Sequence, residues 1–337
     1  MKTPNFFYKN NFISNILSLV FLPISLIYSI FYILIFYYKY IFIFQNKTHD
    51  AKIICVGNLT LGGTGKTEIA MSIGRILFEK NITFCYLTKG YGRKSKDDMF
   101  LPKGFNQENF EKHADEPLLL SQIADTYIYS NRVKFLSSSI AKNYDVIILD
   151  DGLHDNTFKK DLSIALFDAS SLDGNGGIIP SGPKRCPYFL FKSKIDCIIY
   201  TNFDNKSKNQ SIIAKKLNCE NIFYSQIKNN MKNLNGDFIA FSGLGINEKF
   251  FKYLSNNGIN LLKTISFSDH YNYSNQDIEN IIQMQKKLNA VGILTTSKDF
   301  IKIPKSYKNS FIRYEIFHEI DNFKKYLEKS LHFKKVI

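Results

Sequence analysis

Short apolar runs alternate with stretches of helical spacing over most of the chain after residue 51. The runs contain many β-branched residues, which is typical of buried strands, and predict strands at residues 52–57, 83–88, 145–150, 162–167, 195–200, 237–242 and 291–296. Helical spacing occurs at residues 67–80, 248–256 and 276–288. Strands that alternate with helices predict an α/β fold, with a doubly wound, mostly parallel sheet and a second, smaller α/β domain.

The first part of the chain has a different pattern, because no charged residue occurs between positions 12 and 38. A helix of that length reaches roughly 40 Å, more than the ~30 Å of a bilayer core. A cleaved signal peptide has a shorter apolar core, and a buried core helix is seldom apolar all round, so a membrane helix is favoured. Pro23 can kink it or divide it into an interfacial pair, and lysines on both sides leave its orientation open.

A polar stretch without periodicity at residues 205–210 indicates a boundary between the two α/β parts. We therefore expect a membrane anchor at residues 1–44, a nucleotide-binding domain at 45–205 and a smaller α/β domain at 206–337.

Composition narrows the range of functions. The 337 residues carry 44 Lys and Arg against 30 Asp and Glu, a net charge of +14, and 45% of them are hydrophobic, which excludes a wholly disordered chain. Five scattered cysteines argue against a disulfide scaffold and a zinc ribbon. The charge suits nucleic acid, an anionic membrane or a phosphorylated substrate, or it reflects base composition alone. No aromatic-basic RNA motif is present, so nucleic acid is not an expected partner.

A glycine-rich loop lies between the first expected strand and the helix at 67–80. Successive glycines allow backbone N–H groups to turn toward a phosphate, and the following helix directs its positive end at the same anion. The side chain of Lys66 can reach the β- and γ-phosphates of a nucleotide. The expected ATP-binding residues are Thr60, Leu61, Gly62, Gly63, Thr64, Gly65, Lys66 and Thr67.

Two carboxylates come directly after the strand at 145–150, at the edge where ligands of open α/β sheets bind. We expect Asp150 to hold Mg²⁺ together with the hydroxyl of Thr67, whereas Asp151 could serve the metal or the acceptor. The fold is therefore that of a P-loop NTPase.

The class of P-loop protein is narrowed by motifs that the chain lacks. No [NT]KxD guanine motif is present and no DxxG switch follows the strand at Leu149, so GTP specificity is disfavoured. Membrane-surface partitioning ATPases carry an extra lysine before the paired glycines, where this chain has Leu61. A partitioning or scaffold ATPase without a lipid substrate remains the alternative function.

Eight motifs in order resemble those of the tetraacyldisaccharide 4′-kinase family. They are VGNLTLGGTGKT at 56–67, TKGYGR at 88–93, DEP at 115–117, DDGL at 150–153, NGGIIPSGP at 175–183, FSGLG at 241–245, DH at 269–270 and TTSKD at 295–299. The resemblance implies an ATP-dependent kinase. It transfers the γ-phosphate to the 4′-hydroxyl of a tetraacylated diglucosamine 1-phosphate and gives lipid IVA, in the lipid A pathway.

The resemblance also implies roles for single residues. Asp115 is the expected general base, with His270 as its partner, and Arg185 with Lys66 steadies the phosphates. Glu116 is a possible further metal ligand. An acylated substrate requires catalysis at a membrane, which we expect to be the cytoplasmic face of the bacterial inner membrane. Membrane lipids are expected partners, and no protein partner is implied.

Several positions depart from the usual family pattern. Lys89 and Lys160 replace arginines, and His154-Asp155 replaces Gln-His. Cys186 lies in a KRCP run where the family has LREP. The roles of Lys89, His154, Asp155 and Cys186 are therefore open.

Overall fold

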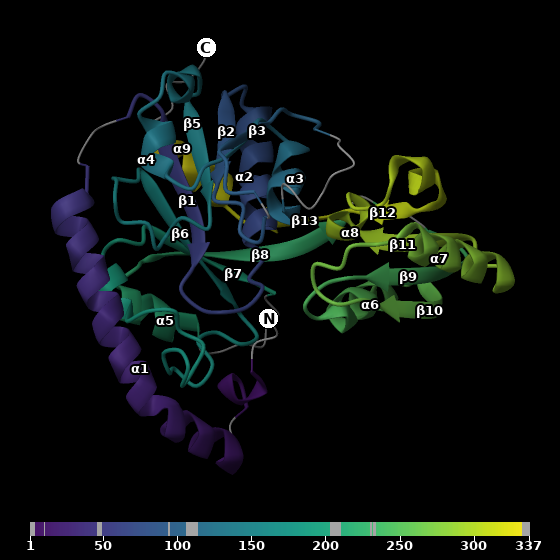
Figure 1. The fold of residues 1–337 in the computed structure, drawn as a ribbon, viewed down its shortest axis with the longest axis horizontal. Helices are drawn as coiled ribbons and strands as arrows, with labels where there is room; N and C mark the ends of the chain where they lie inside the picture. Colours follow the sequence, from purple (N-terminus) through teal and green to yellow (C-terminus); the bar gives the residue numbers. More distant parts are fainter. Residues whose placement is uncertain are drawn as a thin grey trace.

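The computed structural model describes residues 4–9, 11–45, 49–93, 95–105, 114–202, 210–229, 231 and 234–331. It contains two sheets, each with helices packed against it, and one long helix that runs beside the larger part (Figure 1). The larger part lies between this helix and the smaller part.

The larger sheet has nine strands. In spatial order they are β13 (Ile316–Ile320), β8 (Asn221–Asn229), β7 (Cys197–Thr201), β6 (Leu162–Asp168), β1 (Lys52–Asn58), β5 (Val146–Asp150), β2 (Phe84–Thr88), β4 (Thr126–Ile128) and β3 (Met99–Leu101). The pairs from β8 to β4 are parallel, and the edge pairs β13–β8 and β3–β4 are antiparallel. The predicted mostly parallel sheet is confirmed.

Two apolar cores cover the two faces of this sheet because β1, β5 and β6 are buried on both sides. One core includes Ile69, Ile73 and Leu77, the apolar face expected of the helix after the glycine-rich loop. The helices of this part are α2 (Lys66–Glu79), α3 (Asp115–Ser121), α4 (Arg132–Leu136), α5 (Gln210–Leu217) and α9 (Phe323–Leu331).

The smaller sheet has four parallel strands, in the order β10 (Asn260–Ser266), β9 (Asp237–Ser242), β11 (Gly292–Thr296) and β12 (Ile312–Tyr314). Its helices are α6 (Asn247–Asn256), α7 (Asn275–Lys287) and α8 (Ser297–Phe300). The strands expected at 237–242 and 291–296 and the two longer helices are present.

The larger sheet uses chain from both sides of the smaller one. Strands β8 and β13 pair with each other, with Asn229 opposite Ile316, and Phe323 and Leu327 of α9 are buried in the larger core. This arrangement differs from the expected boundary near residue 205, because chain beyond that point returns to the larger sheet. Residues 205–209 of the expected linker lie outside the described residues.

The apolar N-terminal segment forms one helix, α1 (Phe12–Tyr38), followed by one π-helical segment (Lys39–Ile43). Pro23 lies inside α1 and does not divide it. Among the described residues it is the one helix long and apolar enough to cross a membrane, with a mean hydropathy of 2.5 and only 11% of its most apolar window buried. The helix lies along the larger part for much of its length (Figure 1).

Hydroxyl groups on one face of α1 hold it against the loop between β6 and β7. The hydroxyl of Ser25 donates to the carbonyl of Ile178 (2.8 Å) and accepts from the backbone N–H of Ser181 (2.9 Å). The Ser181 hydroxyl donates to the carbonyl of Ser18 (2.7 Å). The other faces remain apolar and exposed, as at Phe12 (78%). The helix is therefore docked by polar contacts and by Phe36, which is buried in the larger core, while most of its other apolar side chains are exposed.

Replacing Ser25 by alanine tests this docking. The change removes the hydrogen bond from Ser25 to the carbonyl of Ile178 and the one that Ser25 accepts from the N–H of Ser181, so we expect a loss of about 1–3 kcal/mol in the free energy of unfolding. Denaturant unfolding of the full chain in mild detergent measures it. Ser29→Ala is the matched control, because its hydroxyl bonds only to the carbonyl of Ser25 in the same helix. Equal losses in the two variants would contradict the docking.

Candidate functional site

The glycine-rich loop forms an open cradle in front of α2. Gly62 and Gly65 have φ values of 115° and 72°, in the left-handed region that favours glycine, and a Cβ at Gly63 would meet nothing within 4 Å. The N-terminal end of α2, at Lys66, follows directly. This geometry suits a bound phosphate group. The backbone N–H of Leu61 donates to the carbonyl of Pro183 (2.7 Å) instead, so it helps hold the loop in place.

Thr60 and Thr64 lie at either end of the cradle and are buried. Thr60 forms a backbone bridge with Lys184, which ties the loop to the segment that carries Arg185. The carbonyl of Thr64 accepts from the hydroxyl of Thr201 (3.2 Å), while its own buried hydroxyl has no partner among the described residues.

Carboxylates expected at the metal site face this loop. The Thr67 hydroxyl donates to Oδ2 of Asp150 (3.2 Å), at the end of β5. Within the described part of the chain, Oδ1 of Asp150 and Oε2 of Glu116 are buried without a hydrogen-bond partner. Burial raises the pKa of Asp150 to about 7; the nearby Lys66 ammonium acts in the opposite direction.

These unpartnered oxygens fit a magnesium ion that takes most of its ligands from nucleotide and water. No cluster of three or more His, Cys, Asp or Glu side chains able to hold a metal occurs in the described residues. Mg²⁺ is commonly held by one or two carboxylates together with substrate phosphates, so this donor set is sufficient. Thr67 and Asp150 are the residues that would hold it, with Glu116 nearby.

Two cations converge on Asp151 beside the loop. The guanidinium of Arg185 donates to Oδ1 of Asp151 (3.3 Å) and to Oδ1 of Asn58 (3.0 Å). Nζ of Lys66 lies 4.0 Å from Oδ2 of Asp151. Burial raises the pKa of Asp151, but Lys66 and Arg185 outweigh it and leave the pKa below its usual range. Asp151 therefore contacts both cations that the sequence predicts to bind phosphate.

Asp115, at the first residue of α3, meets three cations from the smaller part. Its Oδ2 accepts from Nδ1 of His270 (2.9 Å) and lies 2.8 Å from Nζ of Lys302 and 3.7 Å from Nζ of Lys298. Burial raises the pKa of Asp115, yet the hydrogen bond from His270 and the Lys302 ammonium together lower it below the usual value. The same hydrogen bond raises the pKa of His270. The carboxylate is therefore held ionised.

Residue Lys302 was not expected from the sequence. Its side chain is 1% exposed, and it lies in the turn after α8, four residues beyond Lys298 of the TTSKD motif. Because α8 ends at Phe300, no helical spacing in the sequence marks Lys302. The guanidinium of Arg132, also unexpected, donates to the carbonyls of Asp150 (2.8 Å) and Asp151 (3.2 Å) and supports their turn.

The residues with open roles lie around this centre. His154 donates from Nε2 to the carbonyl of Asn58 (3.0 Å) and accepts at Nδ1 from the hydroxyl of Tyr32 in α1 (2.7 Å). Burial lowers its pKa to about 4, so it is neutral. Nζ of Lys89 lies 3.6 Å from Oδ2 of Asp155, and Cys186 is fully buried. These contacts give His154 a structural role between α1 and the strand before the loop.

The site combines a glycine-rich loop at the start of α2, the carboxylates near Thr67, and the buried Asp115 that His270 contacts. This combination is typical of a P-loop phosphotransferase that acts on a hydroxyl group. Residues 17–332 match the family model described as tetraacyldisaccharide-1-P 4′-kinase. The chain belongs to this family.

Individual relatives support this family assignment. The chain is similar to tetraacyldisaccharide 4′-kinases of Rickettsia canadensis and Rickettsia felis, each 34% identical over 89% of this chain and 87% of the relative. The crystal structure of LpxK from Aquifex aeolicus in complex with ATP has a TM-score of 0.73 and 25% identity. It covers 94% of this chain and 98% of that one, so the fold extends to the whole molecule. These matches do not favour the alternative of a partitioning or scaffold ATPase.

Replacing Asp150 by asparagine tests the buried carboxyl group. The unfolded chain ionises this group near pH 4, whereas the folded protein keeps it protonated to about pH 7. Because the folded state binds the extra proton, wild-type stability falls relative to Asp150→Asn as the pH rises from about 4 to about 7, and the difference is constant above. Denaturant unfolding at several pH values with a chelator present measures it.

Asp161→Asn is the control, because this carboxylate is exposed and pairs with Lys52 (3.0 Å). A stability difference between wild type and Asp150→Asn that does not change with pH over this range would contradict the raised pKa.

Proposed function

We propose that the protein transfers the γ-phosphoryl group of ATP to the 4′-hydroxyl of a tetraacylated diglucosamine 1-phosphate and so forms lipid IVA. Family membership supports the reaction class, and the contact between Asp115 and His270 is the observation that carries the acceptor chemistry. That contact joins the two parts of the molecule beside the phosphate loop, where a carboxylate suited to a hydroxyl proton is required.

The donor side is served by the loop and its cations. The backbone N–H groups of the glycines and the ammonium of Lys66 hold the phosphates, and Arg185 is placed to leave Asp151 and bind the charge that spreads during transfer. Mg²⁺, when bound at Thr67 and Asp150, supplies positive charge for the phosphate oxygens. The inference to ATP agrees with the ATP complex of the Aquifex aeolicus relative.

The acceptor side is served by Asp115. Phosphoryl transfer of this type has a loose transition state, so the attacking hydroxyl loses its proton late and needs orientation first. The Asp115 carboxylate accepts the hydrogen bond and then the proton at Oδ1, because Oδ2 already accepts from His270 and Lys302. His270, Lys302 and Lys298 fix the orientation of the carboxylate and keep it ionised until then.

Replacing Lys66 by alanine or Asp115 by asparagine should reduce transfer by about 10²–10⁴-fold, because each removes a charge that acts in the transition state. The measurement uses labelled ATP with a purified acylated disaccharide in detergent micelles. Unfolding curves close to wild type show that the fold is intact, and Asp161→Asn is the control. Near-normal turnover in Asp115→Asn would remove Asp115 as the base, and label released only to water would favour the scaffold ATPase.

We infer that α1 places the enzyme at the membrane, on the cytoplasmic side where ATP is available. Its hydroxyl-bearing face is docked along the protein, and its other faces expose residues such as Leu19 (68%) and Phe31 (61%). A helix docked along its length cannot cross the bilayer without carrying the domain into the lipid. It therefore lies in the interface, where the acylated substrate also resides.

Deleting residues 1–44 should release the protein from vesicles of bacterial lipid extract. The deletion removes the exposed apolar surface of α1, and flotation of the truncated and full chains measures the bound fraction. If the truncated chain remains fully bound, another surface is the anchor.

A further inference from the structure

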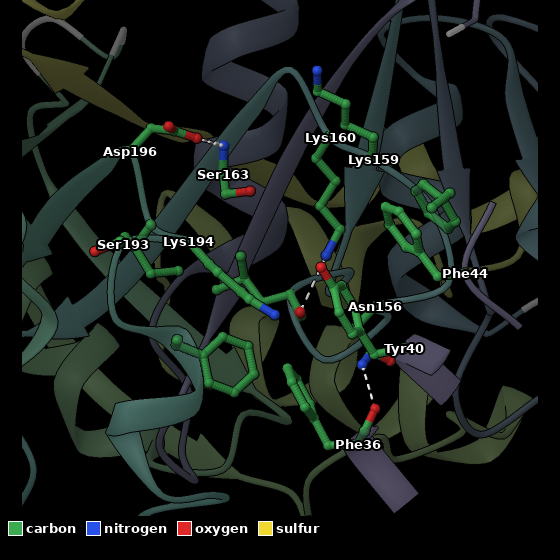
Figure 2. Close-up of a pocket in the computed structure, with 14 residues that line it drawn as sticks. Phe36, Tyr40, Phe44, Asn156, Lys159, Lys160, Ser163, Ser193, Lys194 and Asp196 are labelled. Atoms are coloured by element: carbon green, nitrogen blue, oxygen red, sulfur yellow. Dashed lines mark hydrogen bonds between the residues drawn. The ribbon is translucent and has the colours of Figure 1, made fainter. Parts of the chain in front are cut away.

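A cavity of about 270 Å³ lies beneath the C-terminal end of α1, apart from the phosphate loop (Figure 2). Aromatic side chains from α1, from the segment after it and from two loops form part of its wall; these include Phe36, Tyr40, Phe44, Phe158 and Phe191. Lysines and polar residues from the same loops form much of the rest. Leu153, the last residue of the DDGL motif, reaches the cavity, but the proposed reaction does not use the cavity.

The ammonium groups of Lys160 and Lys194 lie at the cavity without an acidic partner, whereas the ammonium of Lys159 points away from them (Figure 2). Nζ of Lys194 lies 4.5 Å from the centroid of the Phe36 ring and 4.8 Å from that of Tyr40, and Nζ of Lys160 donates to the carbonyl of Leu153 (3.1 Å). Among the described residues, no carboxylate lies within 4.0 Å of Nζ of Lys159, Lys160 or Lys194. The cavity is therefore suited to an anion.

One carboxylate, Asp196, also lines the cavity and opposes this charge. Its Oδ2 accepts from the backbone N–H of Ser163 (2.7 Å), so it is held at the strand ends. Burial raises the pKa of Asp196 and lowers the pKa of Lys160 and Lys194. Two cations, Lys160 and Lys194, against one acid leave the lining positive.

Asn156 adds a buried hydrogen-bond acceptor to the lining. Asn156 is 9% exposed, and its Nδ2 donates to the carbonyl of Phe36 (2.7 Å). Its Oδ1 is buried and has no hydrogen-bond partner in the described part of the chain. Because that oxygen can only accept, a ligand that satisfies it must donate a hydrogen bond, as an alcohol does.

The position of the cavity favours a lipid over a nucleotide. Ser163 and Asp196 lie at the start of β6 and just before β7, at the amino ends of parallel strands whose carboxyl ends face the phosphate loop. The apolar side chains that follow Tyr40 are exposed, with Ile41 at 67% and Phe42 at 73%. An acyl chain attached to a headgroup in the cavity can therefore lie along this apolar surface.

We propose that this cavity binds the headgroup of an anionic glycerophospholipid from the membrane surface. The phosphate diester lies between Lys160 and Lys194, and a headgroup hydroxyl donates to Oδ1 of Asn156. The site fixes the C-terminal end of α1 at the interface. It does not depend on the proposed kinase reaction.

The test uses the full chain in nonionic detergent and short-chain phosphatidylglycerol below its micellar concentration, with binding measured by calorimetry. We expect saturable binding to wild type, a loss of about fivefold in affinity in Lys194→Gln, and little change in Lys192→Gln. Lys192 is exposed, two residues away and outside the lining, so it is the matched control. The Lys194 side chain is exposed too, so both variants should unfold like wild type.

Four results would overturn the proposal. Equal losses in the two variants would indicate diffuse attraction, and equal binding of short-chain phosphatidylcholine would indicate an apolar groove without headgroup recognition. Glycerol phosphate that binds as tightly as the lipid would indicate a soluble phosphate ester. An increase in KM for the acylated disaccharide in Lys194→Gln, measured without phosphatidylglycerol, would assign the cavity to the substrate's own phosphate.

Discussion

The arrangement of the proposed catalytic centre depends on the ionised carboxylate of Asp115 and on the groups that contact it. It is buried, and burial alone would favour its neutral form, so it requires the cations that surround it. All three, His270, Lys298 and Lys302, come from the part built on the smaller sheet, while Asp115 comes from the larger one. The acceptor side of the site therefore exists only where the two parts meet.

A second set of contacts connects the membrane helix with the donor side. The hydroxyl of Tyr28 donates to the carbonyl of Arg185 (2.9 Å), and Tyr32 reaches Asn58 through His154. Asn58 in turn accepts from the guanidinium of Arg185 (3.0 Å). Helix α1 thus forms part of the support of Arg185, and the proposed anchor and the proposed active site are one structural unit.

The central strands of the larger sheet are predicted well from the sequence, because a strand buried on both faces is a continuous apolar run. β1, β5 and β6 are apolar on both faces, and a short apolar run that ends at glycine or aspartate is typical of such a strand. β8 and β10 were missed because they are partly exposed and carry asparagine, glutamine and lysine, so no run or alternation marks them. The predicted boundary near residue 205 followed from the polar stretch at residues 205–210, with no strand recognised directly after it.

Residues of the candidate site could be predicted where a local sequence pattern gives a residue type a specific role. Lys66, Thr67 and Asp150 follow from the strand-loop-helix pattern, and the family resemblance supplied Asp115 and His270, which the structure brings to 2.9 Å of each other. Lys302 could not be told from the many other lysines of a chain with 44 Lys and Arg. Lys302 is buried and paired with Asp115 only because the two parts of the molecule meet there, and no local sequence pattern indicates that contact.

The pairing of β8 with β13 has a consequence for the architecture of the chain. Because Asn229 lies opposite Ile316, the polypeptide leaves and re-enters the nine-stranded sheet at adjacent points. Everything between them is an insertion whose ends a tight hairpin turn could join. The larger sheet therefore has a continuous hydrogen-bonded edge of its own, and the inserted part can be exchanged or lost in evolution without a break in the nucleotide-binding framework.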